Sequence, residues 1–569
     1  MIKNQLEKIL GFTVEATENL EFGDYTANIA MVEYRKMAVA TDSHVPGGKK
    51  EGIIWVRKPG KPWHNTRELA EDIVVGLKDS EDLKRIVDRI EVAGPGFINF
   101  WLKRDVLVGN LIQIGKEKEG YGKSDWGNGK TVVIDYSSPN IAKRFSIGHL
   151  RSTIIGQALY NLYKFGGWNT VGDNHLGDWG TQFGVLIYMV ERENLDPTKL
   201  TVNDWEKLYV DFHKELETKE ELKTVAAEAF KRLENGDTGA KKIWQAALKT
   251  SLAEYDRIYD LLGVKIDYAY GESSYEDQMP AAIEEAKKKG IVVKSEGAWV
   301  IEFDKKYNLP SNVLVKSNGA TTYLTRDLAL LFFRKEKWNP DLQIFEVGSE
   351  QSLYFRQVFA MAEMMGLFNL DQMKHMAHGL IRFEHGKMST RKGLTIKLED
   401  VLDEAIERAK KLGNKDLETA KAVGIGAVKY FDLSHQPSTD IIFDWEKMMA
   451  MEGNSGPYLQ YTVARTNSVI SKAKKMGESK MVDLNIEELS ILRSLIRFSE
   501  VVAGAARNYS PNLLTNYLYD LASRFNTFYN KDKIIGSDNE DFRLALTEGT
   551  GQVLKNGLKL LGIGSPEKM

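Results

Sequence analysis

The chain has 569 residues, of which 43% are hydrophobic and 28% are charged, and its formal net charge at pH 7 is −3. This length exceeds the usual size of one hydrophobic core, so we expect about three to five domains. The absence of cysteine excludes disulfides and thiolate metal sites, and the net negative charge means that any nucleic-acid partner would need local basic patches.

Nothing in the sequence indicates a targeting or membrane segment. The N-terminal stretch MIKNQLE lacks the apolar core of a signal peptide, and the chain has no uninterrupted apolar run of transmembrane length. The overall composition is typical of a globular protein. We therefore expect a cytoplasmic protein.

Residues 1–115 predict a small α/β domain. Its last segment, 91–102, alternates polar and apolar residues after the turn Gly94-Pro95-Gly96, which is typical of a strand that follows a tight turn. The domain is therefore expected to end in a closing strand.

Residues 116–395 predict a doubly wound parallel sheet. Apolar strand-like runs alternate with helical stretches, at 131–135, 170–174, 343–347 and near 376–381. Ligands of such a sheet bind at the carboxyl ends of its strands. The charged, helix-rich piece at about 195–300 predicts an insertion between the two halves. Neither a dinucleotide fingerprint nor a Walker A loop occurs, which argues against an NAD enzyme or a kinase-type fold.

The C-terminal part predicts helices. Residues 396–445 form a connecting region, and the spacing of apolar residues over 446–569 is typical of a helical bundle. The fold class is therefore α/β, with a Rossmann-type central domain, an N-terminal α/β domain and a C-terminal all-α bundle.

Two loops carry the strongest chemical signal. Residues 139–149 follow a predicted strand and lead into a helical stretch at 150–165, and a strand, a glycine turn and a helix N-terminus together favour phosphate binding. Residues 387–393 place three cations around a Ser-Thr pair, which suits a flap over a polyphosphate. Together, in this order, the two loops indicate ATP chemistry.

The two loops resemble the HIGH and KMSKS motifs of class I aminoacyl-tRNA synthetases. Their surroundings resemble the arginyl-tRNA synthetases in particular, at 138–143, 148–156, 174–184 and 388–393, and the resemblance extends over almost the whole chain. It implies ATP as a substrate with Mg²⁺, no protein-bound metal, the partners L-arginine and tRNA(Arg), and a monomer. It also implies tRNA D-loop recognition by 1–115, catalysis by 116–395, contact with the tRNA stem by 396–445 and anticodon binding by 446–569.

The resemblance assigns catalytic roles to both loops. In the first loop His149 would donate to phosphate, and Ser146 stands where the family motif begins with histidine. In the second loop Thr390 and Arg391 displace the second lysine of the motif. The upstream Lys143 resembles the lysine that compensates in such enzymes, although a solvated surface charge is the alternative. Whether Ser146 or Lys143 contacts phosphate stays open. The remaining candidates of the second loop are Lys387, Ser389 and Lys392.

The resemblance also names residues for both small substrates. Tyr323 and Asp327 would bracket the arginine guanidinium, because a buried guanidinium requires a carboxylate partner. Asn140, His149 and Gln351 would hold the rest of arginine. The expected ATP-binding residues are Ser146, Gly148, His149, His375, Gly379 and Met388. The family often has a histidine where this chain has Tyr354, and Asn318-Gly319 is expected to keep a tight turn.

For tRNA, the resemblance indicates residues at both ends of the chain. Phe97 offers a stacking surface and Asn99 an amide to the D-loop, and Tyr458, Tyr461, Arg465 and Met569 are the candidates in the bundle. Plain packing is the alternative for most of these aromatic residues.

We therefore expect an arginine–tRNA ligase whose first step needs bound tRNA. Two alternatives are a catalytically silent paralogue that only binds tRNA and another class I synthetase. The expected acidic pocket argues against the latter, because it favours a cationic side chain.

Overall fold

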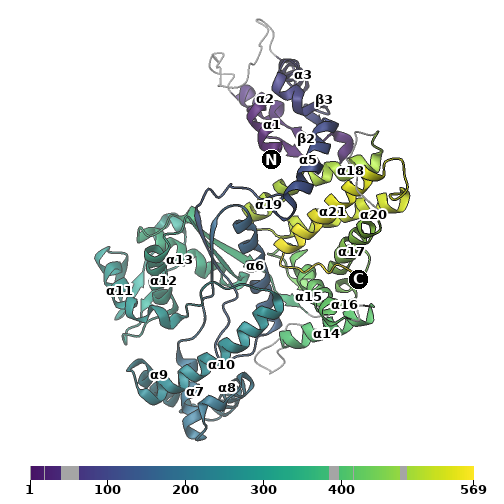
Figure 1. Cartoon of the computed structure of the whole chain (residues 1–569). Coiled ribbons are helices and arrows are strands. Elements are labelled where there is room, and N and C mark those ends of the chain that lie inside the picture. Colours follow the sequence, from purple (N-terminus) through teal and green to yellow (C-terminus); the bar gives the residue numbers. More distant parts are fainter. Residues whose placement is uncertain (1, 18, 40–62, 383–395, 414–415, 474–482) are drawn as a thin grey trace.

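The computed structural model describes residues 2–17, 19–39, 63–382, 396–413, 416–473 and 483–569. In Figure 1 the N-terminal unit lies at the top, the C-terminal helices below it, and the central sheet with its insertion at the lower left. Within the described ranges, every helix is too short or too polar to cross a membrane.

The N-terminal unit is a four-stranded antiparallel sheet covered by helices. The strand order is β1-β2-β4-β3, and the hairpin between β3 and β4 pairs Ala93 with Phe97, as the Gly-Pro-Gly turn predicted. The strands are β1 Glu15–Ala16, β2 Tyr25–Ala27, β3 Val87–Ala93 and β4 Phe97–Leu102. The helices are α1 Ile2–Leu10, α2 Ile29–Val39, α3 Thr66–Leu77 and α4 Glu81–Ile86, and α5 Arg104–Glu117 leads out of the unit.

The central domain is built on a four-stranded parallel sheet in the order β11-β10-β5-β6. The strands are β5 Thr131–Asp135, β6 Asn169–Asp173, β10 Leu342–Gly348 and β11 Met373–His378. The connecting helices are α6 Leu150–Phe165, α12 Tyr323–Lys337 and α13 Ser352–Met364. This arrangement confirms the predicted doubly wound sheet, and the register places Asp135 beside Asp173 at the carboxyl ends of β5 and β6.

Residues 181–315, which include the predicted insertion at about 195–300, combine helices with a small sheet and are called the insertion below. It contains α7 Thr181–Arg192, α8 Val202–Leu216, α9 Leu222–Glu234, α10 Thr238–Leu262, the 3₁₀ helix η5 Glu272–Gln278 and α11 Met279–Lys288. The antiparallel strands β7 Val292–Ser295, β8 Ala298–Ile301 and β9 Asn312–Val315 follow. The sequence analysis did not predict this sheet, because its four-residue strands are half-exposed and carry little periodic signal. The expected turn at Asn318-Gly319 is present, with Gly319 at a φ of +83°.

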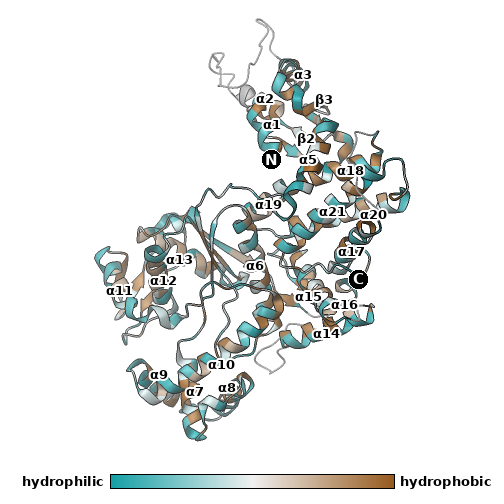
Figure 2. Cartoon of the chain, in the orientation of Figure 1, coloured by the Kyte–Doolittle hydropathy of each residue, from teal (hydrophilic) through white to brown (hydrophobic). Residues whose placement is uncertain are grey.

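The C-terminal part is helical, as predicted. The connecting region contains α14 Leu398–Lys411, α15 Leu417–Leu433 and α16 Trp445–Met448, and a short parallel pair joins β12 Ile381–Arg382 to β13 Ile441–Ile442. The bundle contains α17 Gly456–Lys472, α18 Ile486–Leu495, α19 Phe498–Arg507, α20 Asn512–Lys531 and α21 Glu540–Leu560. Figure 2 shows hydrophilic and hydrophobic residues alternating along these ribbons, as expected for amphipathic helices that bury one face.

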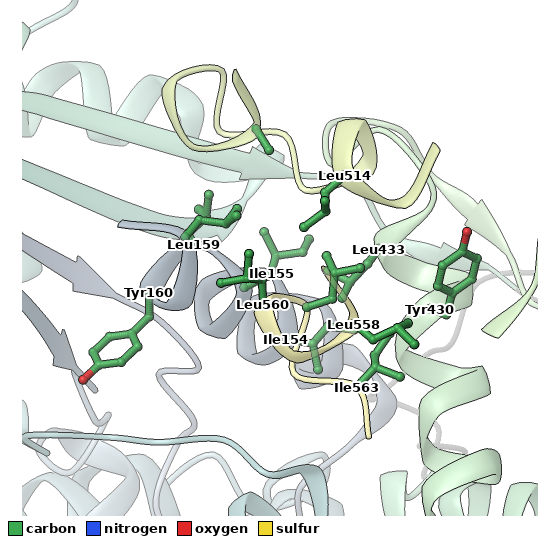
Figure 3. Close-up of a cluster of buried hydrophobic side chains, with 14 of the residues drawn as sticks. Ile154, Ile155, Leu159, Tyr160, Tyr430, Leu433, Leu514, Leu558, Leu560 and Ile563 are labelled. Atoms are coloured by element: carbon green, nitrogen blue, oxygen red, sulfur yellow. The ribbon is translucent and has the colours of Figure 1, made fainter. Parts of the chain in front are cut away.

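The central domain and the bundle share one hydrophobic core. Figure 3 shows α6 side chains lying among side chains of α15, α20 and the C-terminal end of α21. The residues at this junction are buried, and they include Ile154, Ile155, Leu159, Leu433, Leu514, Leu558 and Leu560. The helix that follows the first signature loop is therefore packed directly against the C-terminal bundle.

Candidate active site

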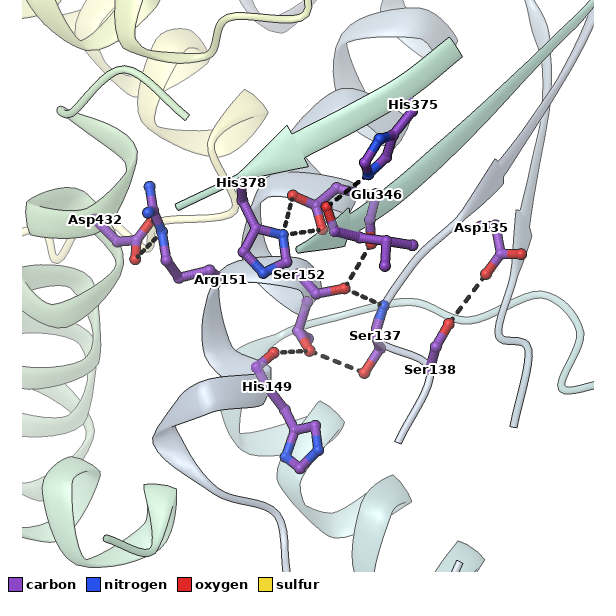
Figure 4. A network of polar contacts seen from close by, with 12 residues as sticks. Asp135, Ser137, Ser138, His149, Arg151, Ser152, Glu346, His375, His378 and Asp432 are labelled. Carbon is purple, nitrogen blue, oxygen red and sulfur yellow. Dashed lines mark hydrogen bonds and ion pairs between the residues drawn. The ribbon is translucent and has the colours of Figure 1, made fainter. Parts of the chain in front are cut away.

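The loop after β5 has a strained backbone that is fixed by buried hydrogen bonds. Ser137, Ser138 and Ala142 have φ values of +76°, +47° and +63°, in a region that side chains disfavour. The Ser137 N–H donates to Ser152 Oγ on α6 at 2.9 Å (Figure 4). The Ser138 N–H donates to Asn174 Oδ1 at 2.9 Å. The loop is thus anchored to α6 on one side and to the end of β6 on the other.

His149 is held as an uncharged hydrogen-bond donor. The Ser146 N–H donates to His149 Nδ1 at 3.1 Å, so Nδ1 is the acceptor and the ring proton lies on Nε2. Burial, aided by the Lys143 ammonium, lowers the pKa of His149 to about 4. The Ser146 hydroxyl also lies 3.1 Å from Nδ1, so Ser146 contacts His149. Gly148, between them, is exposed.

The first loop lies alongside the segment that follows the second loop. The Ile147 N–H donates to the Ile396 carbonyl at 3.1 Å, and the Leu398 N–H donates to the Phe145 carbonyl at 3.1 Å. The second-loop candidates Lys387, Met388, Ser389 and Lys392 lie outside the described residues. The chain nevertheless re-enters the described region directly beside the first loop.

Lys143 lies against an aromatic ring of the insertion. Its Nζ is 5.1 Å from the centroid of the Tyr209 ring on α8, and the side chain is half-buried. Burial lowers the pKa of Lys143, whereas the nearby Glu206 carboxylate opposes this shift. Lys143 is thus half-buried and in contact with a ring, which differs from the alternative interpretation of Lys143 as a solvated surface charge.

Tyr323 and Asp327 lie one turn apart at the start of α12, as a four-residue spacing requires. The Tyr323 side chain is 68% exposed and therefore open to a ligand. Asp327 accepts a hydrogen bond from the Tyr354 hydroxyl of α13. Burial raises the pKa of Asp327, and this hydrogen bond counteracts the shift. The residue that departs from the family pattern, Tyr354, is thus bonded directly to the predicted guanidinium ligand.

Glu272 is a further acidic residue near Asp327 that was not predicted from the sequence. Its Oε2 has no hydrogen-bond partner and lies 3.6 Å from Nε of Arg326. Burial raises the pKa of Glu272 to about 7, and the Asp327 carboxylate adds to the effect. The Asp178 carboxylate holds the adjoining turn by accepting from the Ser273 N–H at 2.9 Å and the Ser273 hydroxyl at 2.6 Å. Glu272 lies in the insertion segment, where only tertiary structure reveals its position beside α12.

Asn140 and Gln351 lie at the carboxyl edge of the sheet. Asn140 is exposed and forms a backbone bridge with Gly177, where any side chain would approach the Asn140 amide to 2.3 Å. Gln351 is exposed in the 3₁₀ turn directly after β10. Both positions agree with the sequence analysis, and their roles in arginine binding stay predictions.

The structure explains His375 and Gly379 by packing. His375 Nε2 donates to the Val347 carbonyl at 3.1 Å, and its ring stacks on Phe355 at 4.7 Å. A side chain at Gly379 would come within 2.4 Å of the Thr439 backbone. The buried histidine at this edge is His378, which bonds Glu346 (Figure 4). ATP binding by His375 and Gly379 stays a prediction.

Asp135 and Asp173 hold a buried arginine between them. Arg334 is fully buried and donates to Asp135 at 2.7 Å and to Asp173 at 2.6 Å. A second buried ion pair joins Arg151 to Asp432 (Figure 4). Since Asp135 is already paired, we assign it a structural role.

Three family models match the chain one after another. Residues 1–102 match the model described as "Arginyl tRNA synthetase N terminal domain". Residues 111–445 match the model described as "tRNA synthetases class I (R), catalytic domain". Residues 459–569 match the model described as "DALR anticodon binding domain". The chain belongs to the arginyl-tRNA synthetase family. It is an arginine–tRNA ligase, and nothing in the comparisons supports a silent paralogue or another class I synthetase.

Relatives and solved structures of arginyl-tRNA synthetases agree with this assignment. The arginine–tRNA ligase of Clostridium botulinum strain Alaska E43 is 40% identical over 523 residues, which cover 88% of this chain and 92% of that protein. The arginine–tRNA ligase of Halothermothrix orenii is 38% identical over 519 residues, which cover 88% of this chain and 90% of that protein. The crystal structure of the Plasmodium falciparum arginyl-tRNA synthetase has a TM-score of 0.81 at 25% identity, over 100% of this chain and 98% of that one. The Thermus thermophilus structure, at 22% identity and 100% coverage of both chains, has the same TM-score and shows the shared fold.

The tRNA-binding candidates of this arginyl-tRNA synthetase differ in accessibility. In the bundle, the Arg465 guanidinium contacts two exposed tyrosine rings, at 4.9 Å from the Tyr461 centroid and 4.7 Å from the Tyr529 centroid. Tyr529, on α20, was not predicted, because its approach to α17 depends on helix packing. Tyr458 is partly buried and accepts from the Asn526 amide at 2.9 Å. Met569 is partly buried and packs against the core.

At the N-terminal end, Phe97 is 38% exposed at the hairpin. Asn99 lies on the same face of β4 but is buried, and its Oδ1 accepts from the Thr26 hydroxyl at 2.7 Å. Phe97 is therefore open to stacking, whereas the amide oxygen of Asn99 is already engaged.

Proposed function

We propose that this arginyl-tRNA synthetase activates L-arginine with ATP and Mg²⁺ and transfers it to the terminal adenosine of tRNA(Arg), with tRNA bound before the first step. It would act in the cytoplasm as a monomer. One observation supports the substrate choice above all others, namely the buried carboxyl groups of Glu272 and Asp327 beside the exposed ring of Tyr323.

Guanidinium recognition follows from the charge of this pocket. Without substrate, burial keeps the pKa values of both carboxyl groups high, so the empty pocket carries unfavourable negative charge. A guanidinium relieves this cost by pairing with both carboxylates, and the Tyr323 ring offers a π-face to the cation. A neutral amino acid would leave the two carboxylates with only the Arg326 guanidinium and the Tyr354 hydroxyl as partners, so the pocket favours a cation.

In the first step an oxygen of the arginine carboxylate bonds to the α-phosphorus of ATP. The bond from that phosphorus to the bridging oxygen breaks, and pyrophosphate leaves with the electron pair. His149 donates from Nε2 to a phosphate oxygen without giving up a proton, because its ring is neutral throughout the physiological range. Lys143 supplies a positive charge for the leaving pyrophosphate. In the second step a ribose hydroxyl of the terminal adenosine attacks the activated carbonyl, and AMP leaves.

The flanking units would position the tRNA. Residues 1–115 contact the D-loop through Phe97, residues 396–445 contact the stem, and residues 446–569 bind the anticodon through Tyr461, Arg465 and Tyr529. Two partly exposed rings in contact with one guanidinium offer stacking surfaces for unpaired bases.

The test is arginine-dependent ATP–pyrophosphate exchange, measured with and without tRNA(Arg), for the wild type and for Lys143→Ala. We expect exchange only when tRNA is present. The exchange rate of Lys143→Ala should be at least tenfold lower than that of the wild type, because one charged contact in a transition state typically contributes about this much. The matched control is Lys164→Ala, since Lys164 also lies over a ring, that of Tyr160, but at the far end of α6. Exchange without tRNA, or full activity of Lys143→Ala, would contradict the corresponding part of the proposal.

A further inference from the structure

The insertion helices hold the first signature loop. The Tyr255 hydroxyl of α10 donates to the Asn140 carbonyl at 2.6 Å and to the Lys143 carbonyl at 3.0 Å. Glu206 of α8 forms an ion pair with Arg144, the residue after Lys143. The backbone around Lys143 is thus fixed by the insertion and not by the parallel sheet alone.

On α8, Tyr209 faces Lys143 one turn after Glu206. The Tyr209 ring is itself held in place, because the His213 ring packs on it with a centroid separation of 4.2 Å. His213 also bonds the Tyr209 carbonyl at 2.9 Å. Burial raises the pKa of the Tyr209 hydroxyl, and the nearby Tyr323 adds to the effect. Tyr209 is therefore a fixed ring that contacts the lysine of the first loop.

The chemistry of this contact suits a lysine that must act on phosphate. A carboxylate beside the ammonium would neutralise it and compete with the triphosphate, and Glu206 is already bonded to Arg144. An aromatic ring attracts the ammonium through its quadrupole and leaves the full positive charge available. The ring also restricts the lysine side chain, whose rotamer freedom would otherwise oppose an ordered contact.

We propose that Tyr209 is a positioning residue for arginine activation, whose ring holds the Lys143 ammonium in place for the triphosphate of ATP. This inference rests on the proposed role of Lys143. It gives the insertion a part in catalysis, because the helix that carries Tyr209 belongs to that segment.

The experiment is a double-mutant cycle on tRNA-dependent ATP–pyrophosphate exchange, with the variants Tyr209→Leu, Lys143→Ala and both together. Tyr209→Leu should lower kcat about tenfold, the loss expected for one partly desolvated cation–π contact, and leave the KM for arginine within about twofold. Tyr209→Phe keeps the ring and should retain near wild-type exchange. In the Lys143→Ala background, Tyr209→Leu should have no further effect.

Tyr188→Leu is the matched control, because Tyr188 is a partly buried tyrosine of the insertion whose ring lies under Arg192. It should keep full exchange. If Tyr209→Leu does not fold, as judged by its melting curve, then Tyr209→Trp and Tyr209→Met replace it, and only Tyr209→Met should show the tenfold loss of kcat.

The outcomes separate this inference from the role of Lys143. Loss in Lys143→Ala with full activity in Tyr209→Leu overturns the inference and leaves the role of Lys143 standing. Equal losses from Tyr209→Leu with and without Lys143 also overturn it, because Tyr209 would then act by another route. Full activity in Lys143→Ala overturns both the proposed role of Lys143 and the inference on Tyr209.

Discussion

At the scale of residues, the proposed arginine pocket has two carboxyl groups with different surroundings. Glu272 has no hydrogen-bond donor on Oε2 and a pKa of about 7, whereas Asp327 is bonded by the Tyr354 hydroxyl. The two groups should therefore respond differently to pH and to mutation. Glu272 lies 3.6 Å from the Arg326 guanidinium and would gain hydrogen bonds from the substrate, whereas Asp327 already accepts one from Tyr354.

Glu272→Gln should raise the KM for arginine by at least about 30-fold, because a desolvated charge pair typically contributes 2 kcal/mol or more to binding. In the wild type the raised pKa keeps Glu272 protonated below about pH 7, so this KM should increase as the pH falls through that value. The variant should lack this increase. The measurement is the pH profile of the arginine KM between pH 6 and 8.5, with the surface variant Glu363→Gln as control. A flat wild-type profile would contradict the assignment.

Tyr354→Phe tests the residue that departs from the family pattern. Removing the hydroxyl takes a hydrogen bond from a buried carboxylate, which typically costs about 1.5 kcal/mol or more, so the arginine KM should rise about tenfold. The pKa of Asp327 should also rise, which moves the pH profile to higher pH. Tyr307→Phe is the matched control, because it removes a phenol–carboxylate bond of 2.6 Å to Glu363 outside the pocket. Equal KM values for Tyr354→Phe and the wild type would show that the bond does not support binding.

The sequence predicted some of these residues and missed others for a physical reason. Tyr323, Asp327 and His149 lie in short contiguous motifs, so their spacing was visible. Glu272, Tyr209 and Tyr529 contact segments that are distant in the sequence, and no local pattern marks them.

At the scale of elements, one buried lysine joins three segments of the chain. Lys429 of α15 is 1% exposed, and its Nζ donates to the Leu262 carbonyl at the end of α10, at 2.7 Å, and to the Gly562 carbonyl after α21. Burial lowers the pKa of Lys429 to about 7. The insertion, the connecting region and the C-terminal segment therefore meet at a single ammonium group.

This lysine should make stability depend on pH. Its pKa is lower in the folded than in the unfolded state, so between about pH 7 and 10.5 the unfolded chain binds the extra proton. Stability should then rise with pH in this window, by up to about 1.4 kcal/mol per pH unit from this group. Lys429→Met should lack this contribution. The measurement is the melting temperature of the wild type and of Lys429→Met at pH 7 and pH 9. Equal changes of melting temperature with pH in the two proteins would contradict a contribution from Lys429.

The elements with strong periodicity were predicted well. The strands of the parallel sheet and α6 follow apolar runs in the sequence, and the structure has them at nearly the predicted positions. The small sheet of β7, β8 and β9 was missed, since its residues are partly exposed and its strands are stabilised by pairing, not by a local apolar pattern.

At the scale of the whole molecule, the shared core links the anticodon end to the first signature loop. The α6 residues that follow His149 pack against α15, α20 and α21, so the bundle cannot shift without affecting that helix. Close packing transmits small displacements because protein interiors have few voids. This arrangement offers a physical route for the expected dependence of arginine activation on bound tRNA.

Arg465→Ala should raise the KM for tRNA(Arg) about tenfold in aminoacylation, since stacking on a base contributes about 1–3 kcal/mol, and it should leave the KM for arginine and ATP unchanged. The control is Arg232→Ala, an exposed arginine of the insertion that pairs with Glu191. A change in the KM for arginine with an unchanged KM for tRNA(Arg) would show that Arg465 does not bind tRNA.

The most direct test of the central claim is aminoacylation of unfractionated tRNA, with each of the twenty amino acids offered separately. The buried carboxyl groups of Glu272 and Asp327 predict charging with arginine alone, and little or no charging with lysine, whose compact ammonium cannot bond two carboxylates in the forked geometry of a guanidinium. Charging with another amino acid in preference to arginine, or no charging at all, would contradict the account.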